Sequence, residues 1–370
     1  MIKFLSGAIL SLTLFSLTSC DKDSDGPSIA PYNIPSSYTF ENVDFTEATA
    51  QVKMLDGINK YMSKAQANTD KVPLDQSKVD NLWNNTGNAF DTAWLNSTGL
   101  SLAEITSDAP TFKGYLDALV TLSNQDLTPA ADGSAGFIAR NAGKILVSDK
   151  GLEYVQAIQK GTMGAALFKE AMYLLDLVAS SDNNTVVPGE GTEMAHTFDL
   201  AFGYFSIPVN YDTTAEFATN NRPGLLFWGN YIRERGLYIE AHDKIWKAFR
   251  TGRAAIVAKD IATVNKQVGI IKEYWEKVAA AAAWAYITIP QGQSGNLASQ
   301  FHALSEGFGF IASLKYRPST SKLSDAQYQQ LVDILGPDTN LYELISDPAF
   351  TQLNAAKEIL KTAYGQLQAQ

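Results

Sequence analysis

Apolar residues recur at intervals of three and four along most of this chain, and no segment shows sustained alternation with a period of two. Because a helix has about 3.6 residues per turn, this spacing places the apolar side chains on one helix face. The stretch containing Val264, Val268, Ile271 and Trp275 is one example. The pattern predicts an all-α protein built as one or two helical bundles.

Several segments carry this pattern clearly, and turn-forming residues separate them. We predict helices over residues 46–67, 108–125, 152–179, 237–258, 261–289, 324–335 and 350–368. Ser324 and Gln327 have the spacing of a capping box, which marks a helix start. Stretches rich in Gly, Asn, Pro and Ser indicate linkers at residues 123–136, 180–192, 206–223, 290–296 and 317–323.

The first residues have the layout of a secretory signal peptide. Lys3 supplies a positive charge, and the apolar run that follows is too short to cross a bilayer. The run ends in Leu17-Thr18-Ser19-Cys20, which resembles the lipobox of bacterial lipoproteins and implies acylation of Cys20. We therefore expect a signal peptide over residues 1–19, a lipidated flexible tether over 20–37 and a helical domain over 38–370.

Composition excludes several classes of function. The 370 residues include 29 Lys and Arg and 39 Asp and Glu, so the formal net charge is −10. Nucleic-acid binding depends on basic residues that neutralise phosphates, so we expect no nucleic-acid partner. The single cysteine, Cys20, rules out an internal disulfide and a cysteine-based zinc site.

Two segments in the second half of the chain share a pattern. His196 precedes Phe202-Gly203-Tyr204, and His302 precedes Phe308-Gly309-Phe310, with the same spacing in both segments. The match predicts an internal duplication with pseudo-two-fold helical architecture, whose repeat cores lie near residues 193–205 and 299–311.

Helical spacing brings comparable polar groups together in each repeat. The first repeat places His196, Asp199 and Gly203 on one side of a helix, opposite an apolar stripe. The second places His302, Glu306 and Gly309 in the same relation. Because Gly in a helix interior costs roughly 0.5–1 kcal/mol relative to Ala, its use in both repeats indicates close approach of another backbone or a ligand.

Imidazole and carboxylate groups are ligands for iron, zinc and manganese. One interpretation is that the two helices converge on a polar ligand or on a metal, with iron or another divalent ion as the cofactor. The candidate metal ligands are Glu193, His196, Asp199, His302 and Glu306. The alternative is that His196 and Asp199 form a hydrogen-bonded pair that only holds packed helices together. Arg250 and Arg253 are candidates either for a clamp on an anionic ligand or for salt bridges to facing acids.

The lipobox, the repeat and the His-x-x-acid helix resemble the imelysin-like bacterial lipoproteins. The resemblance is closer still to a related lipoprotein group with a domain of unknown function, through Phe202-Gly203-Tyr204 and the segment from Phe249 to Ile256. The imelysin signature Gly-x-His-x-x-Glu falls here on Met194, His196 and Asp199, so its Gly and its Glu are both replaced. The resemblance implies a duplicated helical bundle anchored in the envelope and associated with iron uptake.

Three interpretations of function stay open. The first is a non-catalytic, lipid-anchored binding protein that assists uptake of iron or an iron-containing ligand. It would sit in the outer membrane of a Gram-negative bacterium, facing the periplasm or the surface, beside an outer-membrane uptake system. The second is a metallopeptidase, by family analogy alone. The third is a structural or partner-binding lipoprotein without a metal site.

Overall fold

The computed structural model describes residues 29–216 and 222–368. The predicted signal peptide and the predicted lipidation site at Cys20 lie outside these residues. Residues Tyr32–Gln370 form one compact unit. Within the described residues, no helix combines the length and the apolar character needed to cross a membrane.

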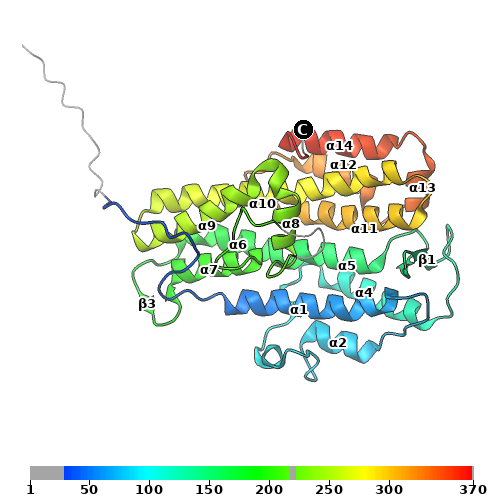
Figure 1. The fold of residues 1–370 in the computed structure, drawn as a ribbon, viewed down its shortest axis with the longest axis horizontal. Helices are drawn as coiled ribbons and strands as arrows, with labels where there is room; N and C mark the ends of the chain where they lie inside the picture. Colours follow the sequence, from blue (N-terminus) through cyan, green and yellow to red (C-terminus); the bar gives the residue numbers. More distant parts are fainter. Residues whose placement is uncertain (1–28, 217–221, 369–370) are drawn as a thin grey trace, which may run out of the picture. The chain divides into compact units, whose positions relative to one another are not determined.

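The compact unit is mostly helical, as predicted (Figure 1). Its longer helices are α1 (Thr46–Ser63), α2 (Gln76–Asn84), α4 (Ala109–Asn124), α5 (Tyr154–Thr162), α6 (Lys169–Leu177), α7 (Glu193–Phe205), α9 (Ala241–Val257), α10 (Ile261–Thr288), α11 (Leu297–Ser313), α12 (Asp325–Leu335) and α14 (Thr351–Tyr364). The short ones are α3 (Leu102–Ile105), α8 (Trp228–Glu234) and α13 (Leu341–Ser346). Each segment predicted to be helical contains at least one of the longer helices, whereas α2 lies outside every predicted segment.

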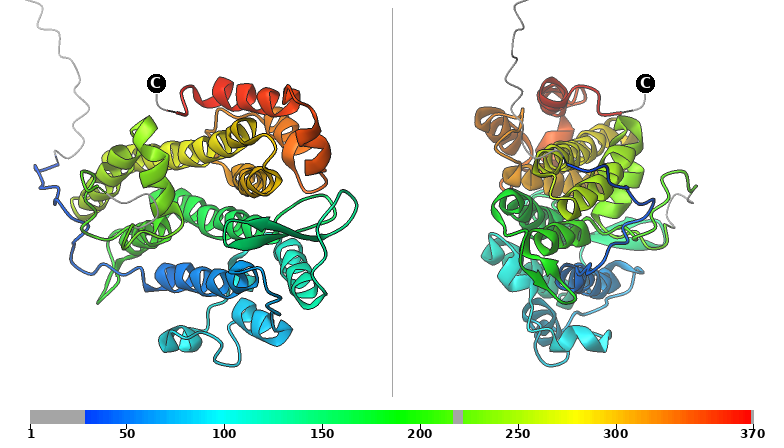
Figure 2. Two further views of the ribbon diagram at one scale, coloured as in Figure 1. Left: turned by 45° about the vertical axis from the view of Figure 1, so that its right-hand side comes forward. Right: turned by 90° about the vertical axis from the view of Figure 1, so that its left-hand side faces the viewer.

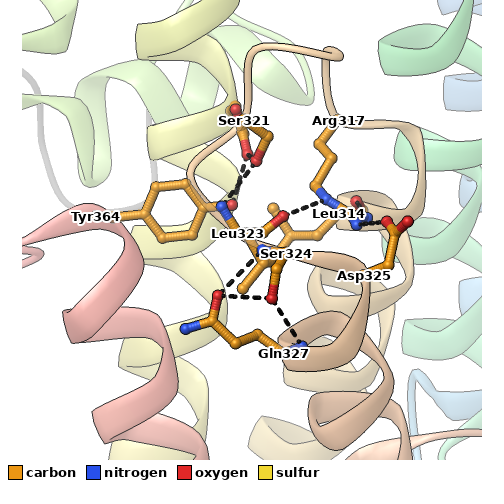
Figure 3. A network of polar contacts seen from close by, with 9 residues as sticks. Leu314, Arg317, Ser321, Leu323, Ser324, Asp325, Gln327 and Tyr364 are labelled. Carbon is orange, nitrogen blue, oxygen red and sulfur yellow. Dashed lines mark hydrogen bonds and ion pairs between the residues drawn. The ribbon is translucent and has the colours of Figure 1, made fainter.

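The boundaries follow local chemistry. The Ser324 hydroxyl accepts from the Gln327 amide at 3.2 Å, and the Gln327 side chain accepts from the Ser324 amide at 3.0 Å. Figure 3 shows this capping box, which confirms the predicted start of α12. The predicted helix 152–179 is interrupted by a π-helical turn, Met163–Phe168, between α5 and α6. There the Met163 carbonyl accepts a hydrogen bond from the Trp228 indole at 2.9 Å.

Two small antiparallel hairpins depart from the prediction of helices alone. Strands β1 (Gly136–Arg140) and β2 (Gly143–Val147) form one, and β3 (Val186–Val187) and β4 (Gly191–Thr192) form the other. Asn141 turns the first hairpin with a positive φ of 53°. These strands are too short for a period-two pattern to stand out, so the sequence pattern predicts no strand at either place.

Helix α10 lies at the centre of the packing. Its residues Val278–Ala283 are fully buried, and the small alanine side chains let α9 and α11 approach closely. Figure 2 (left) shows α14, α10, the α5–α6 pair and α1 in succession from top to bottom. Trp275 on α10 contacts Phe168 and Trp228, with ring centroids 5.8 and 6.1 Å away. One continuous apolar core therefore joins helices from distant parts of the sequence.

The chain packs on this core before the predicted boundary at residue 38. The Tyr32 hydroxyl donates to Asp260 at 3.0 Å, and Arg250 donates to the Pro35 carbonyl at 2.7 Å. Tyr38 is buried and stacks on Phe202 with centroids 3.8 Å apart. Residues 32–37, predicted to belong to the flexible tether, are therefore part of the helical unit.

Candidate functional site

The segment predicted to be the first repeat lies on α7, and its carboxylate is buried. Asp199 Oδ1 accepts from the Tyr38 hydroxyl at 2.6 Å and from Arg253 Nε at 2.8 Å. The Asp199 and Arg253 side chains are 0% and 2% exposed. Asp199 Oδ2 is buried and has no hydrogen-bond partner among the described residues. This cluster ties α7 to α9 and to the N-terminal segment, which is a structural role.

Burial has the largest effect on the pKa of Asp199. It raises the pKa of Asp199 from 3.8 to about 6, although Arg253 and Tyr38 act in the opposite direction. Burial also raises the pKa of Tyr38 well above its usual range, and the Asp199 charge adds to that effect. Asp199 is therefore a buried acid held by two donors, and neither donor is His196.

The other α7 candidates point elsewhere. His196 is half-buried, and its Nδ1 atom lacks a hydrogen-bond partner among the described residues. Glu193 Oε2 accepts from the Asp182 amide at 3.0 Å. A Cβ atom on Gly203 would lie 2.8 Å from Ala48 Cβ and 2.9 Å from Phe45 Cβ. The predicted close approach at Gly203 is thus made by the chain at the start of α1.

The second repeat lies on α11 and is built differently. His302 Nδ1 lies 2.7 Å from Glu153 Oε2, and the Glu153 side chain is fully buried at the start of α5. A carboxylate accepts, so the Nδ1 atom carries the hydrogen and donates. Ser305, also on α11, accepts from the Glu153 amide at 2.8 Å. Glu153 therefore holds the imidazole of His302 through Nδ1, and Nε2 is the ring nitrogen left for a different partner.

Glu306 lies one helical turn further along α11 and pairs with α5. Its Oε1 atom is 3.3 Å from Lys160 Nζ, and both side chains are about nine-tenths buried. Lys160 Nζ also donates to Gln159 at 2.6 Å and lies 5.5 Å from the centre of the Tyr231 ring. The carboxylate of Glu306 thus has a cation on the facing helix.

Gly309 allows α11 and α5 to come this close. A Cβ atom there would lie 2.3 Å from Lys160 Cβ and 2.8 Å from the Gly161 amide nitrogen. In the π-helical turn that continues α5, a Cβ on Gly164 would lie 2.5 Å from Ser313 Cα. The prediction that Gly309 marks a close backbone approach is confirmed, and the approaching backbone is α5.

His302 and Glu306 both line a polar cavity of about 670 Å³, which we call the His302 cleft. Its lining residues are Glu216, Arg222, Arg233, Glu234, Arg235, Leu237, Tyr238, Tyr286, His302 and Glu306. Glu234 bridges two of the arginines, at 3.1 Å from Arg222 and 2.8 Å from Arg235. Arg235 also lies 5.2 Å from the centre of the Tyr286 ring. The cleft therefore offers both donors and acceptors to a ligand.

The two repeats do not form one metal centre. Among the residues that the structure describes, no group of three or more His, Cys, Asp and Glu is placed to hold a metal ion. The predicted set of Glu193, His196, Asp199, His302 and Glu306 is wrong as a single site. The reason is that each helix turns its carboxylate to a cation on a different helix, Arg253 on α9 for Asp199 and Lys160 on α5 for Glu306.

The predicted arginine pair also separates. Arg253 takes the salt-bridge role through Asp199, and it lies 5.2 Å from the centre of the Phe40 ring. Arg250 donates to the Pro35 carbonyl and lies 5.0 Å from the centre of the Trp246 ring. The two guanidinium groups hold the N-terminal segment and do not form a joint clamp on a ligand.

Most of the residues that line or support the His302 cleft were not predicted, and three of them, Glu153, Lys160 and Arg235, show why. Glu153 and Lys160 come from α5 and its start, and Arg235 follows α8. Gly161 and Gly164, three apart within a predicted helix, were the available signal that α5 contacts another helix closely. Nothing in the sequence indicated that Glu153 faces His302, because the two meet only when α5 packs against α11.

Comparison with known proteins gives one match. A family model described as "Domain of unknown function (DUF4856)" covers residues 35–365. No curated protein and no solved structure matches the chain.

Proposed function

The chain belongs to the family of this domain of unknown function, and on that premise we propose that it is a lipid-anchored, non-catalytic binding protein of the outer envelope. Its ligand occupies the His302 cleft. One observation carries this proposal: His302 is fixed by the buried carboxylate of Glu153 and lines a cavity of about 670 Å³. A second group that holds an imidazole in one tautomer and orientation is typical of histidines that act on a ligand.

The chemistry of the cleft defines the kind of ligand. With Nδ1 donating to Glu153, Nε2 is the ring atom of His302 left for a ligand, and it either accepts a hydrogen bond or, when it carries a hydrogen, donates one. The arginine side chains present donors that suit carboxylate or phosphate groups. A compact polar ligand with both anionic groups and hydroxyl groups fits this lining best.

The iron version of the proposal takes a specific form here. The described residues form no group of three metal ligands, so they offer no coordination site to an unchelated ion. Iron would arrive already chelated, with the chelator supplying its ligands and its anionic groups meeting Arg222 and Arg235. The protein would then pass the chelate to an outer-membrane uptake system.

The duplication predicted from the sequence remains part of the proposal. It is supported by the parallel use of Gly203 and Gly309, each packed against another segment, and by the burial of an acid beside each. The partners differ, because α7 contacts α6, α1 and α9 whereas α11 contacts α5 and α10. We propose that the two repeats diverged, and that the His and acid of the second, His302 and Glu306, came to line a polar cleft. The relation to imelysin-like lipoproteins stays a prediction.

The cleft can be tested by calorimetry on the purified protein. We expect ferric citrate, and more weakly citrate alone, to bind, while iron and zinc salts without a chelator do not. His302→Ala should weaken binding about 10–100-fold, since a hydrogen bond to a charged group is worth roughly 1.5–3 kcal/mol.

His196→Ala is the matched control, because it removes the corresponding histidine of the first repeat, which lies outside the cleft. Equal losses in the His196 and His302 variants would contradict a specific role for the cleft. Tight binding of unchelated zinc that both histidines control would instead favour the shared metal centre. An absence of binding for every anion tried would remove the ligand class proposed here.

A further inference from the structure

Four aliphatic side chains are exposed where α9 meets α10. Val186 and Val187 on β3 are 58% and 45% exposed, Val257 at the end of α9 is 65% exposed, and Ile261 at the start of α10 is 37% exposed. We call these four residues the valine surface. Large exposed apolar groups gathered in one place are typical of an interaction surface, whereas single ones are ordinary.

These residues belong to one continuous area. Val186 and Val257 line the same cavity of about 300 Å³. The Asn183 side chain donates to the Ile256 carbonyl at 2.8 Å, and Lys259 donates to Asn184 at 2.9 Å. Figure 1 shows β3 and the turn between α9 and α10 at the same end of the helical unit.

Tyr32, the first residue of the compact helical unit, lies beside this area. Tyr32 donates to Asp260, which is the residue before Ile261. Only residues 21–31 separate Tyr32 from Cys20. At roughly 3.3–3.6 Å per residue, this stretch spans about 40 Å at full extension, and less in any bent form.

We propose that the valine surface rests on the lipid bilayer in which Cys20 is anchored. This inference rests on the lipid anchoring given under the proposed function. A short link to the bilayer keeps the surface at a high effective concentration, so a weak apolar contact is enough. The net charge of −10 disfavours attraction to anionic head groups, so the contact is made by apolar side chains.

The test uses the full lipidated chain in phosphatidylcholine vesicles. The lipid occupies the thiol of Cys20, so a cysteine introduced elsewhere is the only one open to an environment-sensitive fluorescent label. Ile261→Cys reports on the valine surface. Ile289→Cys is a matched control, because both isoleucines are 37% exposed and they lie at opposite ends of α10. A 28-residue helix separates them by about 42 Å.

The label at position 261 should shift to the blue in vesicles and be quenched by nitroxide-bearing lipids, whereas the label at 289 should change little. Val257→Asp should abolish that quenching without altering the helical circular dichroism, since Val257 is exposed. Equal responses at 261 and 289, or none at 261 in protein that floats with vesicles, would overturn the inference. Cys20→Ala is the control for anchoring and should not float with the vesicles. If protein with Cys20 intact also fails to float, the lipid anchor itself is overturned.

Discussion

At the scale of single residues, Asp199 and Glu306 illustrate how similar sequence positions acquire different surroundings. Both are acids on the helix of a repeat, and both meet a cation from another helix. Asp199 is sealed between Tyr38 and Arg253, whereas Glu306 lines a cavity. The first acid therefore contributes to the fold, and the second is available to a ligand.

The pH response of Asp199 follows from burial. Its pKa in the folded protein, about 6, lies above the ordinary value of 3.8. The folded state therefore binds the proton more tightly than the unfolded chain does. The contribution of Asp199 to stability is complete below pH 3.8 and is lost as the pH rises through about 6.

Removing the Arg253 guanidinium should make the stability of the protein depend more strongly on the protonation of Asp199. In Arg253→Met, the carboxylate loses the charge that lowers its pKa, so the pKa of Asp199 rises further. We expect the free energy of unfolding to fall by about 3–5 kcal/mol at pH 7, because a buried charge is left without its partner. The loss should shrink as the pH is lowered to 5, where protonation removes that charge.

Urea unfolding at several pH values measures this change. Arg250→Met is the control, because that guanidinium contacts a carbonyl and an indole ring and bridges no acid among the described residues. A loss in Arg253→Met that stays constant between pH 5 and 7 would contradict the coupling to Asp199.

At the scale of helices, the crossing of α5 and α11 positions His302 and Glu306, the two α11 residues that line the His302 cleft. Gly309 and Gly164 bring the two helices close enough for Glu153 to reach His302 and for Lys160 to reach Glu306. A helix interior normally disfavours Gly. These glycines therefore lower the intrinsic stability of their helices but allow the helices to cross closely. The positions of His302 and Glu306 depend on that crossing.

Gly309→Ala tests the crossing directly. The new Cβ would lie 2.3 Å from Lys160 Cβ, on a backbone that cannot move away without separating the helices. We expect a loss of about 1–3 kcal/mol in the free energy of unfolding, as for other overpacked cores. Binding to the His302 cleft should weaken as well, because Glu153 and His302 would move apart.

Gly269→Ala provides the comparison. Gly269 lies on α10, and a Cβ atom there would meet no heavy atom within 4 Å beyond its own helix backbone and its chain neighbours. Alanine at this position should stabilise the protein by roughly 0.5–1 kcal/mol through helix propensity alone. Stabilisation by both substitutions would show that α5 and α11 tolerate a wider separation.

At the scale of the whole molecule, one core connects both repeats. Helix α10 is buried along most of its second half, and Phe205 from the first repeat lies 4.5 Å from Trp275, measured between ring centroids. Phe310 from the second repeat lies 5.9 Å from Trp228, which in turn contacts Trp275. The two segments predicted to be repeats therefore contribute side chains to a single contiguous core.

This continuity predicts cooperative unfolding. Thermal unfolding followed by far-ultraviolet circular dichroism and by tryptophan fluorescence should give one coincident transition. Arg253→Met, which removes the partner of Asp199 on α7, and Gly309→Ala on α11 should both shift that same transition to lower temperature. Two separate transitions, each moved by only one of these substitutions, would mean that the repeats fold as independent units.

Part of the candidate site could be predicted from sequence, and part could not. His302 and Glu306 were recognised because helical spacing and the repeated His and Gly place them on one face of a helix. The prediction missed Glu153, Lys160 and Arg235, because the sequence around a residue does not indicate which helix that residue will face. The metal centre was wrong for the same reason, since convergence of α7 and α11 was assumed from their likeness.

The sequence by itself determined the helical class, the positions of most of the longer helices and the acidic charge of the chain. These depend on apolar spacing and capping residues within a few turns, which are local properties. Only the tertiary structure decided which carboxylate is sealed inside the core and which faces a cavity. Such partners lie far apart along the chain, as Glu153 and His302 do, and only the packing of their helices brings them within 2.7 Å.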